Sequence, residues 1–154
     1  MEIVEVVDLT SEEKIFVFNL WNAEYPAKIA YDKVSDLDGF LGDLSEVQHY
    51  FIKEDENMFG WAMTFLRDKE LSFGITLDSN FHRRGYGSKL LDYLKVKNGS
   101  LCGWGIDHDT DVRLNGLNYK SPLGFYIRNG FEVFENIRMY NGKINAVKIC
   151  FRRE

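Results

Sequence analysis

Long apolar segments, a basic N-terminus and an excess of positive charge are all missing from this chain of 154 residues. No apolar run approaches 18 residues, so no membrane-spanning helix is expected. The first residues are acidic rather than basic, so no secretory signal peptide is expected. The formal net charge of −5 argues against a nucleic-acid-binding surface. We therefore expect a cytoplasmic location, with neither membrane nor nucleic acid among the partners.

Cysteine is scarce as well. The two cysteines, Cys102 and Cys150, fall in expected strands and lack the spacing of a metal site. We expect them to be buried free thiols in a reducing cytosol, and we expect no metal. The length fits one domain spanning residues 1–154, and the hydrophobic content of 45% suffices for a core.

Apolar periodicity divides the chain into short strands and helices. A capping box of Thr10 and Glu13 predicts the start of the first helix. Ser121 as N-cap and Pro122 at the first position predict the start of the last one. The expected strands cover residues 2–8, 47–53, 59–67, 71–77, 101–107, 131–140 and 143–152, and the expected helices cover residues 11–22, 35–44, about 87–97 and a short segment from 121. This order predicts an α+β fold with a mixed sheet.

One stretch carries most of the functional information. After the strand 71–77 comes a basic turn with Gly85 and Gly87, and then a helix with an apolar face. Glycines let the backbone approach a ligand closely, and free amides at a helix N-terminus bind phosphate. A Walker loop does not fit the spacing, and a Rossmann turn needs a third glycine where Leu90 stands. A phosphate-binding turn of a third kind and a purely structural turn remain.

A second motif lies downstream. Phe125-Tyr126 is followed by Gly130-Phe131 at the junction of the short helix and the next strand. Together, this motif and the turn His82-Arg83-Arg84-Gly85-Tyr86-Gly87 resemble the two signatures of the GNAT (GCN5-related N-acetyltransferase) family. His82 departs from the glutamine or arginine usual at the first position. The resemblance covers residues 58–134 best.

The resemblance implies a fold and a cofactor. The fold has a twisted mixed sheet of six to seven strands, about four helices, and two central parallel strands that splay apart to hold coenzyme A. Acetyl-CoA would be the co-substrate. The residues implied in binding it are Ile75, Thr76, Leu77, His82, Arg83, Arg84, Gly85, Tyr86, Gly87, Ser88, Phe125 and Arg128.

Glycines inside the two central strands need a reason, because glycine weakens a strand by roughly 0.5–1 kcal/mol. They are Gly74 before the turn, and Gly103 and Gly105 around Trp104. Close packing explains them, and so does a ligand backbone lying against the strand.

The resemblance also suggests catalytic roles. Tyr126 matches the tyrosine that lies near the coenzyme A sulfur in many members, where a phenol with a pKa of about 10 acts as general acid. Backbone amides at 75–77 can polarise the thioester carbonyl. Candidate bases for the amine are Glu70 at the head of the central strand, and Asp107, His108 and Asp109 after its neighbour. His49, within an apolar strand, is expected to be structural.

For the acceptor we expect the first helix and the loop after Asp107 to contribute. An acid flanked by aromatic rings suits a cationic amine. The candidates are Trp21, Glu24, Tyr25, Trp104 and His108. We therefore expect an acetyl-CoA-dependent N-acetyltransferase that acts on a primary amine of a small molecule or protein, as a monomer or homodimer. The alternatives are a non-catalytic acyl-CoA-binding module of the same fold and a structural domain.

Overall fold

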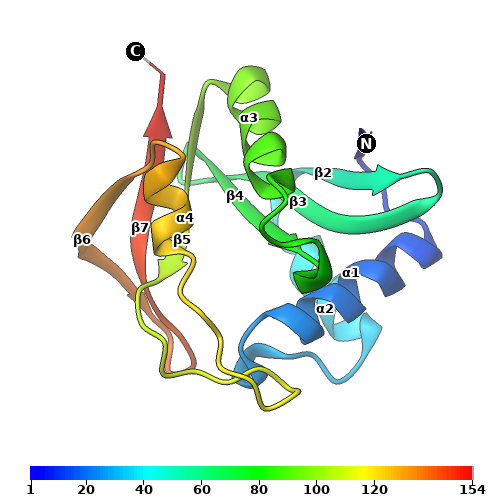
Figure 1. Cartoon of the computed structure of the whole chain (residues 1–154), viewed down its shortest axis with the longest axis horizontal. Helices are drawn as coiled ribbons and strands as arrows, with labels where there is room; N and C mark the ends of the chain where they lie inside the picture. Colours follow the sequence, from blue (N-terminus) through cyan, green and yellow to red (C-terminus); the bar gives the residue numbers. More distant parts are fainter. Residues whose placement is uncertain (154) are drawn as a thin grey trace.

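The computed structural model describes residues 1–153, and within this range the chain forms one mixed sheet with helices on both faces (Figure 1). The seven strands are β1 (Glu2–Val6), β2 (Ser45–Glu54), β3 (Asn57–Arg67), β4 (Glu70–Leu77), β5 (Ser100–Ile106), β6 (Glu132–Tyr140) and β7 (Asn145–Arg152). The helices are α1 (Ser11–Glu24), α2 (Val34–Gly42), α3 (Tyr86–Asn98) and α4 (Leu123–Arg128), with 3-10 turns η1 (Ala27–Ile29) and η2 (Ser79–Phe81). The expected α+β class and the mixed sheet are confirmed. No helix in the described range is long and apolar enough to cross a membrane.

The sheet has the order β1-β2-β3-β4-β5-β7-β6, and its central pair is unusual. Every other neighbouring pair is antiparallel, whereas β4 and β5 are parallel. Over residues 1–153, β4 and β5 are in register at one pair, Ser72 with Cys102. By contrast, β3 stays paired with β4 along the whole of β4. The two parallel strands therefore separate after Ser72, as expected for a site built between them.

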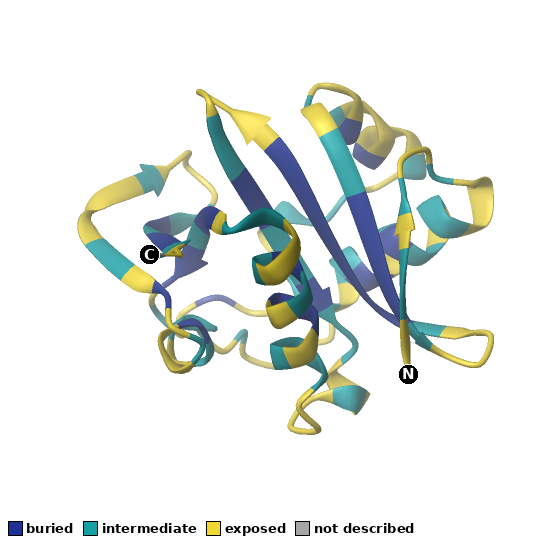
Figure 2. Cartoon of the chain, turned by 90° about the horizontal axis from the view of Figure 1, so that it is seen from above, coloured by how far each residue is buried: buried dark blue, intermediate teal, exposed yellow. Residues whose placement is uncertain are grey.

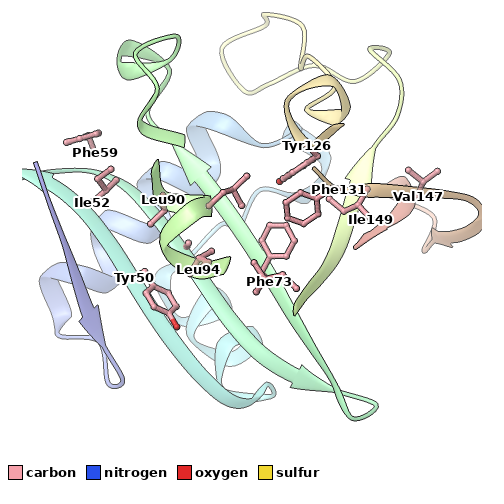
Figure 3. Close-up of a cluster of buried hydrophobic side chains, with 13 residues drawn as sticks. Tyr50, Ile52, Phe59, Phe73, Leu90, Leu94, Tyr126, Phe131, Val147 and Ile149 are labelled. Carbon is pink, nitrogen blue, oxygen red and sulfur yellow. The ribbon is translucent and has the colours of Figure 1, made fainter. Parts of the chain in front are cut away.

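Two clusters of buried side chains cover the two faces of the sheet. Strand side chains alternate between faces, so Phe51 packs under α1 and α2 while its neighbour Ile52 packs under α3. In the same way, Trp61 packs on the side of α1 and α2, and its neighbour Ala62 packs on the side of α3. The central strands are accordingly buried over much of their length (Figure 2). On the α3 side, Leu90 and Leu94 meet the sheet (Figure 3). Because both of their faces are buried, the central strands are held in place on either side of the gap between β4 and β5.

The predicted helix ends are mostly correct. The Oγ1 atom of Thr10 accepts from the backbone N–H of Glu13, and the Glu13 carboxylate accepts from the N–H of Thr10, so the capping box is confirmed. The last helix begins one residue later than predicted, at Leu123 rather than Pro122. Ser121 still serves its first turn, because its Oγ accepts from the N–H of Leu123 while donating to the carbonyl of Ile106. That second bond ties the start of α4 to the end of β5.

The expectation of free thiols is wrong. Cys102 on β5 and Cys150 on β7 lie directly opposite each other in the antiparallel pair and form a disulfide. The two residues are 48 positions apart in the sequence, and only the pairing of β5 with β7 reveals their proximity. Both are almost fully buried.

We expect reduction of this disulfide to lower the free energy of unfolding by about 2–4 kcal/mol, because the cross-link restricts the unfolded chain over a long loop. Urea unfolding with and without a phosphine reductant measures the difference. A Cys102→Ala/Cys150→Ala variant serves as the control and should not respond to reductant. Equal midpoints for oxidised and reduced wild type would show that the cross-link does not stabilise the fold.

His49 on β2 has the structural role expected for it. It is 4% exposed, and its Nδ1 accepts from the indole N–H of Trp61 at 3.0 Å. Burial lowers the pKa of His49 to about 4, although Glu13 and Asp8 act in the opposite direction. The neutral ring is therefore the form that the fold requires.

A pH dependence of stability follows from this shift. Between pH 6.5 and 4 the unfolded chain binds the proton and the folded protein does not, so the free energy of unfolding falls as the pH falls. The loss attributable to His49 should reach about 3 kcal/mol near pH 4. Urea unfolding at several pH values measures it against His49→Gln, which keeps an acceptor for Trp61. If the free energy of unfolding changes with pH in the same way in both proteins, His49 is not the source of the pH dependence.

Candidate active site

A cavity of about 800 Å³ opens where β4 and β5 separate. Its walls come from segments far apart in the sequence: α1 and η1, the end of β4, the turn before α3, β5, α4, and the loop that joins β5 to α4. Ile144 and Ala146 close it from the β6–β7 side. The cavity is the place where the separated strands leave backbone and side chains available to a ligand.

The turn from η2 to α3 forms one end of the cavity. Gly85 is the N-cap of α3 and has a φ of 82°, and Arg83 has a φ of 65°. These left-handed residues fold the chain so that the first turn of α3 faces the cavity. In residues 1–153, no acceptor binds the backbone N–H groups of residues 84–88. Free amides at a helix N-terminus bind anions, and a diphosphate fits this arrangement.

Basic side chains occur in this turn and on α4. Arg83 and Arg128 line the cavity, whereas Arg84 does not and lies over the ring of Phe81 at 5.3 Å. His82 lines the cavity too, but its Nε2 lies 2.9 Å from the carbonyl oxygen of Leu77. His82 therefore holds the turn closed against the end of β4. The other predicted cofactor residues all line the cavity: Ile75, Thr76, Leu77, Gly85, Tyr86, Gly87, Ser88 and Phe125.

The glycines of the central strands have different roles. A Cβ atom on Gly103 would lie 2.9 Å from the Phe73 ring and 3.1 Å from the Phe73 carbonyl oxygen, so this glycine permits close packing of β5 on β4. Gly74 lines the cavity, and a Cβ atom there would meet only Met63. Gly87 brings the first turn of α3 against Phe125, whose Cζ would lie 3.0 Å from an added Cβ. Close packing of the strands therefore explains Gly103. We interpret Gly74 as leaving room for a ligand beside β4.

Tyr126 on α4 lines the cavity between the strands. Its ring packs edge-on against Phe73 at 5.9 Å and against Phe131 at 5.5 Å (Figure 3). Burial raises the pKa of Tyr126 well above 10, and the nearby phenols of Tyr25 and Tyr119 raise it further. The phenol is therefore protonated at neutral pH, and the structure shows no acceptor for it among residues 1–153. It is a proton or hydrogen-bond donor without a partner.

Aromatic side chains from α1, β5 and the loop after β5 form another part of the cavity wall. Trp21 and Tyr25 contact each other edge-on at 4.6 Å, and Trp104 and Tyr119 complete the wall. The Trp21 indole donates to the carbonyl of Ile29 at 2.9 Å, and the Tyr25 hydroxyl donates to the carbonyl of Ile75 at 3.3 Å. Burial raises the pKa values of Tyr25 and Tyr119. This wall is apolar, and its phenols are neutral.

Glu24 lines the cavity but is not available to a ligand. One carboxylate oxygen accepts from Arg113 at 3.1 Å, and the other accepts from the N–H and Oγ of Ser79 at 3.1 and 3.0 Å. Its side chain is 12% exposed. Glu24 therefore joins α1 to η2 and to the loop after β5, which does not support its predicted role at the acceptor.

The predicted bases lie outside the cavity wall. Glu70 starts β4, at the opposite end from the turn, and pairs with Lys148 at 2.8 Å. Asp107 accepts from both terminal nitrogens of Arg138 at 2.8 and 3.1 Å, which lowers the pKa of Asp107 and weakens it as a base. Asp109 accepts from the N–H of Ser121, and His108 contacts Thr110. The geometry does not support a role for any of the four as base.

The cavity is also lined by four residues that were not predicted from the sequence, Phe73, Tyr119, Lys120 and Asn129. Tyr119 and Lys120 belong to a segment without periodicity. The N–H of Tyr119 donates to the carbonyl of Asp111 at 2.9 Å, so a turn within the loop places them. No sequence signal indicated that turn.

Comparison with known proteins agrees with this geometry. Residues 45–133 match the family model described as "Acetyltransferase (GNAT) domain". No curated protein matches. Among solved structures, an aminoglycoside 6'-N-acetyltransferase complexed with coenzyme A is similar with a TM-score of 0.74 and 12% identity over 98% of this chain and 96% of that one.

Two further structures have the same fold. A ribosomal-protein-alanine N-acetyltransferase from Brucella melitensis matches with a TM-score of 0.66 and 12% identity, covering 99% of each chain. A phosphinothricin acetyltransferase from Sinorhizobium meliloti in complex with AcCoA matches with a TM-score of 0.65 and 10% identity over 98% of this chain and 88% of that one. At these identities the likeness establishes the fold.

Proposed function

Because this chain belongs to the GNAT acetyltransferase family, we propose that it is an acetyl-CoA-dependent N-acetyltransferase that acts on a primary amine. The observation that carries the proposal is a single cavity that joins a diphosphate-binding turn to an unpartnered phenol. A cofactor with a diphosphate and a long flexible arm can reach from one to the other between β4 and β5.

The residues present fit acetyl-CoA. The free N–H groups of residues 84–88, with Arg83 and Arg128, would hold its diphosphate. The backbone of residues 74–77 would lie beside its arm, where β4 has separated from β5. Acetyl-CoA supplies an activated acetyl group as a thioester, with a thiolate as leaving group.

Tyr126 would donate a proton or a hydrogen bond to that sulfur. Its phenol is protonated at neutral pH and has no competing acceptor in the described part of the chain. Donation to an atom that gains negative charge in the transition state lowers the barrier. Backbone N–H groups of β4 near Thr76 would polarise the acyl carbonyl in the same way.

The amine must lose a proton before it attacks. The cavity wall has no free carboxylate within residues 1–153, because Glu24 is its one acid and is fully engaged. Burial among Trp21, Tyr25 and Trp104 disfavours an ammonium ion and lowers the pKa of a bound amine. We therefore propose that the apolar wall favours the neutral amine and that water accepts the proton.

The missing base also favours one alternative, a non-catalytic acyl-CoA-binding module. Both candidates require acetyl-CoA to bind, but only an enzyme releases free thiol in the presence of an amine. The test measures the melting temperature with acetyl-CoA, coenzyme A or ADP, and then measures thiol release with a panel of amines. Binding raises the melting temperature by mass action. An unchanged melting temperature with acetyl-CoA would exclude both candidates, and binding without thiol release would favour the module.

Two expectations from the sequence stay proposals. One is a monomer or homodimer. The other is a cytoplasmic location, against which the Cys102–Cys150 disulfide counts, because disulfides are rare in reducing compartments.

A further inference from the structure

We propose that the acceptor is a monoamine: a primary amine on an aromatic or aliphatic body that carries no second positive charge. The inference rests on the proposed acetyltransferase function and specifies its substrate class. It depends on three properties of the cavity: its acidic side chains are paired, a lysine adds positive charge to its wall, and the rest of the acceptor wall is apolar.

The first property is the absence of a usable negative charge. Within residues 1–153, Glu24 is the one acid of the cavity wall, and Arg113 and Ser79 occupy both of its oxygens. Two acids of the adjoining loop lie outside the cavity wall: Asp107 pairs with Arg138, and Asp111 is buried, with Oδ1 paired with Lys28 at 2.7 Å and Oδ2 without a partner among the described residues. A polycationic acceptor would find no free carboxylate for its additional ammonium groups.

The second property is positive charge on the part of the cavity wall that comes from the loop after β5. His82, Arg83 and Arg128 belong to the phosphate-binding side, but Lys120 follows Tyr119 in the loop after β5. Lys120 is exposed, and it has no ion pair among the described residues. Its ammonium group repels a second cation on the acceptor, most strongly at low ionic strength.

The third property is the apolar character of the wall formed by α1, β5, the loop after β5 and the β6–β7 side. Trp21, Tyr25, Trp104, Tyr119, Ile144 and Ala146 present rings and methyl groups to the cavity. The polar atoms of Trp21 and Tyr25 already donate to backbone carbonyls. An aromatic or aliphatic body can pack here beside a single amine in its neutral form, whereas a polyhydroxylated body would lose hydrogen bonds to water. The aminoglycoside 6'-N-acetyltransferase thus shares the fold with this chain, but the wall here does not suit such a polar, multiply charged acceptor.

Steady-state thiol release at saturating acetyl-CoA tests the proposal with phenethylamine and hexylamine as monoamines, and with spermidine and kanamycin as polycations. We expect kcat/KM for the monoamines to exceed that for the polycations at least tenfold. The ratio should widen as salt is lowered, because repulsion from Lys120 is screened by salt.

Charge reversal at Lys120 provides a sharper test. Lys120→Glu should raise kcat/KM for spermidine at least threefold more than it raises kcat/KM for hexylamine, because spermidine carries more positive charge. The matched control is Lys33→Glu, an exposed lysine before α2 that does not line the cavity, and it should change neither value. An equal rise in both variants would indicate a general charge effect and overturn the role of Lys120.

Three outcomes separate failure of this inference from failure of the proposed function. Thiol release that is faster with spermidine or kanamycin than with the monoamines overturns the inference and leaves the acetyltransferase intact. If acetyl-CoA raises the melting temperature but the monoamines neither react nor quench the fluorescence of Trp21 and Trp104 with coenzyme A bound, the inference is also overturned. If acetyl-CoA does not bind, the proposed function fails and the inference fails with it.

Discussion

A Tyr126→Phe protein should turn over about 100-fold more slowly than wild type at saturating acetyl-CoA and amine, while its KM for acetyl-CoA changes less than threefold. The substitution keeps the ring that packs against Phe73 and Phe131, so the fold and the cavity remain. It removes only the phenol hydroxyl. An interaction made in the transition state affects kcat more than substrate binding.

The size of this effect follows from the pKa of Tyr126. General acids contribute about 10²–10⁴-fold, most when the donor's pKa lies near the working pH. Burial raises the pKa of Tyr126 well above 10, which makes complete proton transfer to a thiolate unfavourable. A strong hydrogen bond to the leaving sulfur is the more favourable contribution, so we expect the lower end of the range.

Tyr119→Phe is the matched comparison, because Tyr119 is a second phenol of the same cavity with a raised pKa. It should lower kcat less than tenfold. The raised pKa of Tyr126 also predicts that deprotonation of this residue does not limit kcat up to pH 10. If folded Tyr126→Phe retains wild-type kcat, Tyr126 is not part of the mechanism.

The fold was predictable because its signals are local. Thr10 and Glu13 define a helix start by their own hydrogen bonds, and alternation of apolar residues defines the strands. The turn around Gly85 was predictable for the same reason, since left-handed glycine, basic residues and an amphipathic helix follow one another in the sequence. Resemblance to a known family then indicated where Tyr126 belongs.

The acceptor side was not predictable, because it depends on contacts between distant segments. Glu24 is an acid beside aromatic residues, as an amine site would need, but Arg113 approaches it from the loop after β5 and removes its charge from use. Asp107 ends a central strand, yet Arg138 from β6 binds it. Cys102 and Cys150 are brought together only by the pairing of β5 with β7. In each case the partner lies at least 31 residues away.

The phosphate-binding turn permits the second prediction of large effect. Gly85→Val should abolish the rise in melting temperature that acetyl-CoA causes. Gly85 is the N-cap of α3 with a φ of 82°, and its neighbours present the free N–H groups. A branched side chain at this position would occupy the approach of a diphosphate to those groups and would disturb the backbone that aims them. We expect acetyl-CoA affinity to fall at least 100-fold.

The matched control is Gly99→Val at the other end of the same helix. Gly85 has a φ of 82° and a ψ of 2°, Gly99 has a φ of 81° and a ψ of −51°, and no atom lies within 4 Å of an added Cβ at either position. A side chain is strained at both positions, and more so at Gly99, whose ψ lies further from the left-handed helical region. Gly99 is the C-cap of α3 and does not line the cavity. Both variants should therefore melt at reduced temperatures without ligand, Gly99→Val at least as low as Gly85→Val, but only Gly99→Val should retain the acetyl-CoA shift. Titration calorimetry with acetyl-CoA gives the two affinities directly. Because Gly99→Val imposes at least as much strain on the helix as Gly85→Val, equal loss of affinity would assign the effect to a weakened helix. Full affinity in Gly85→Val would place the diphosphate elsewhere.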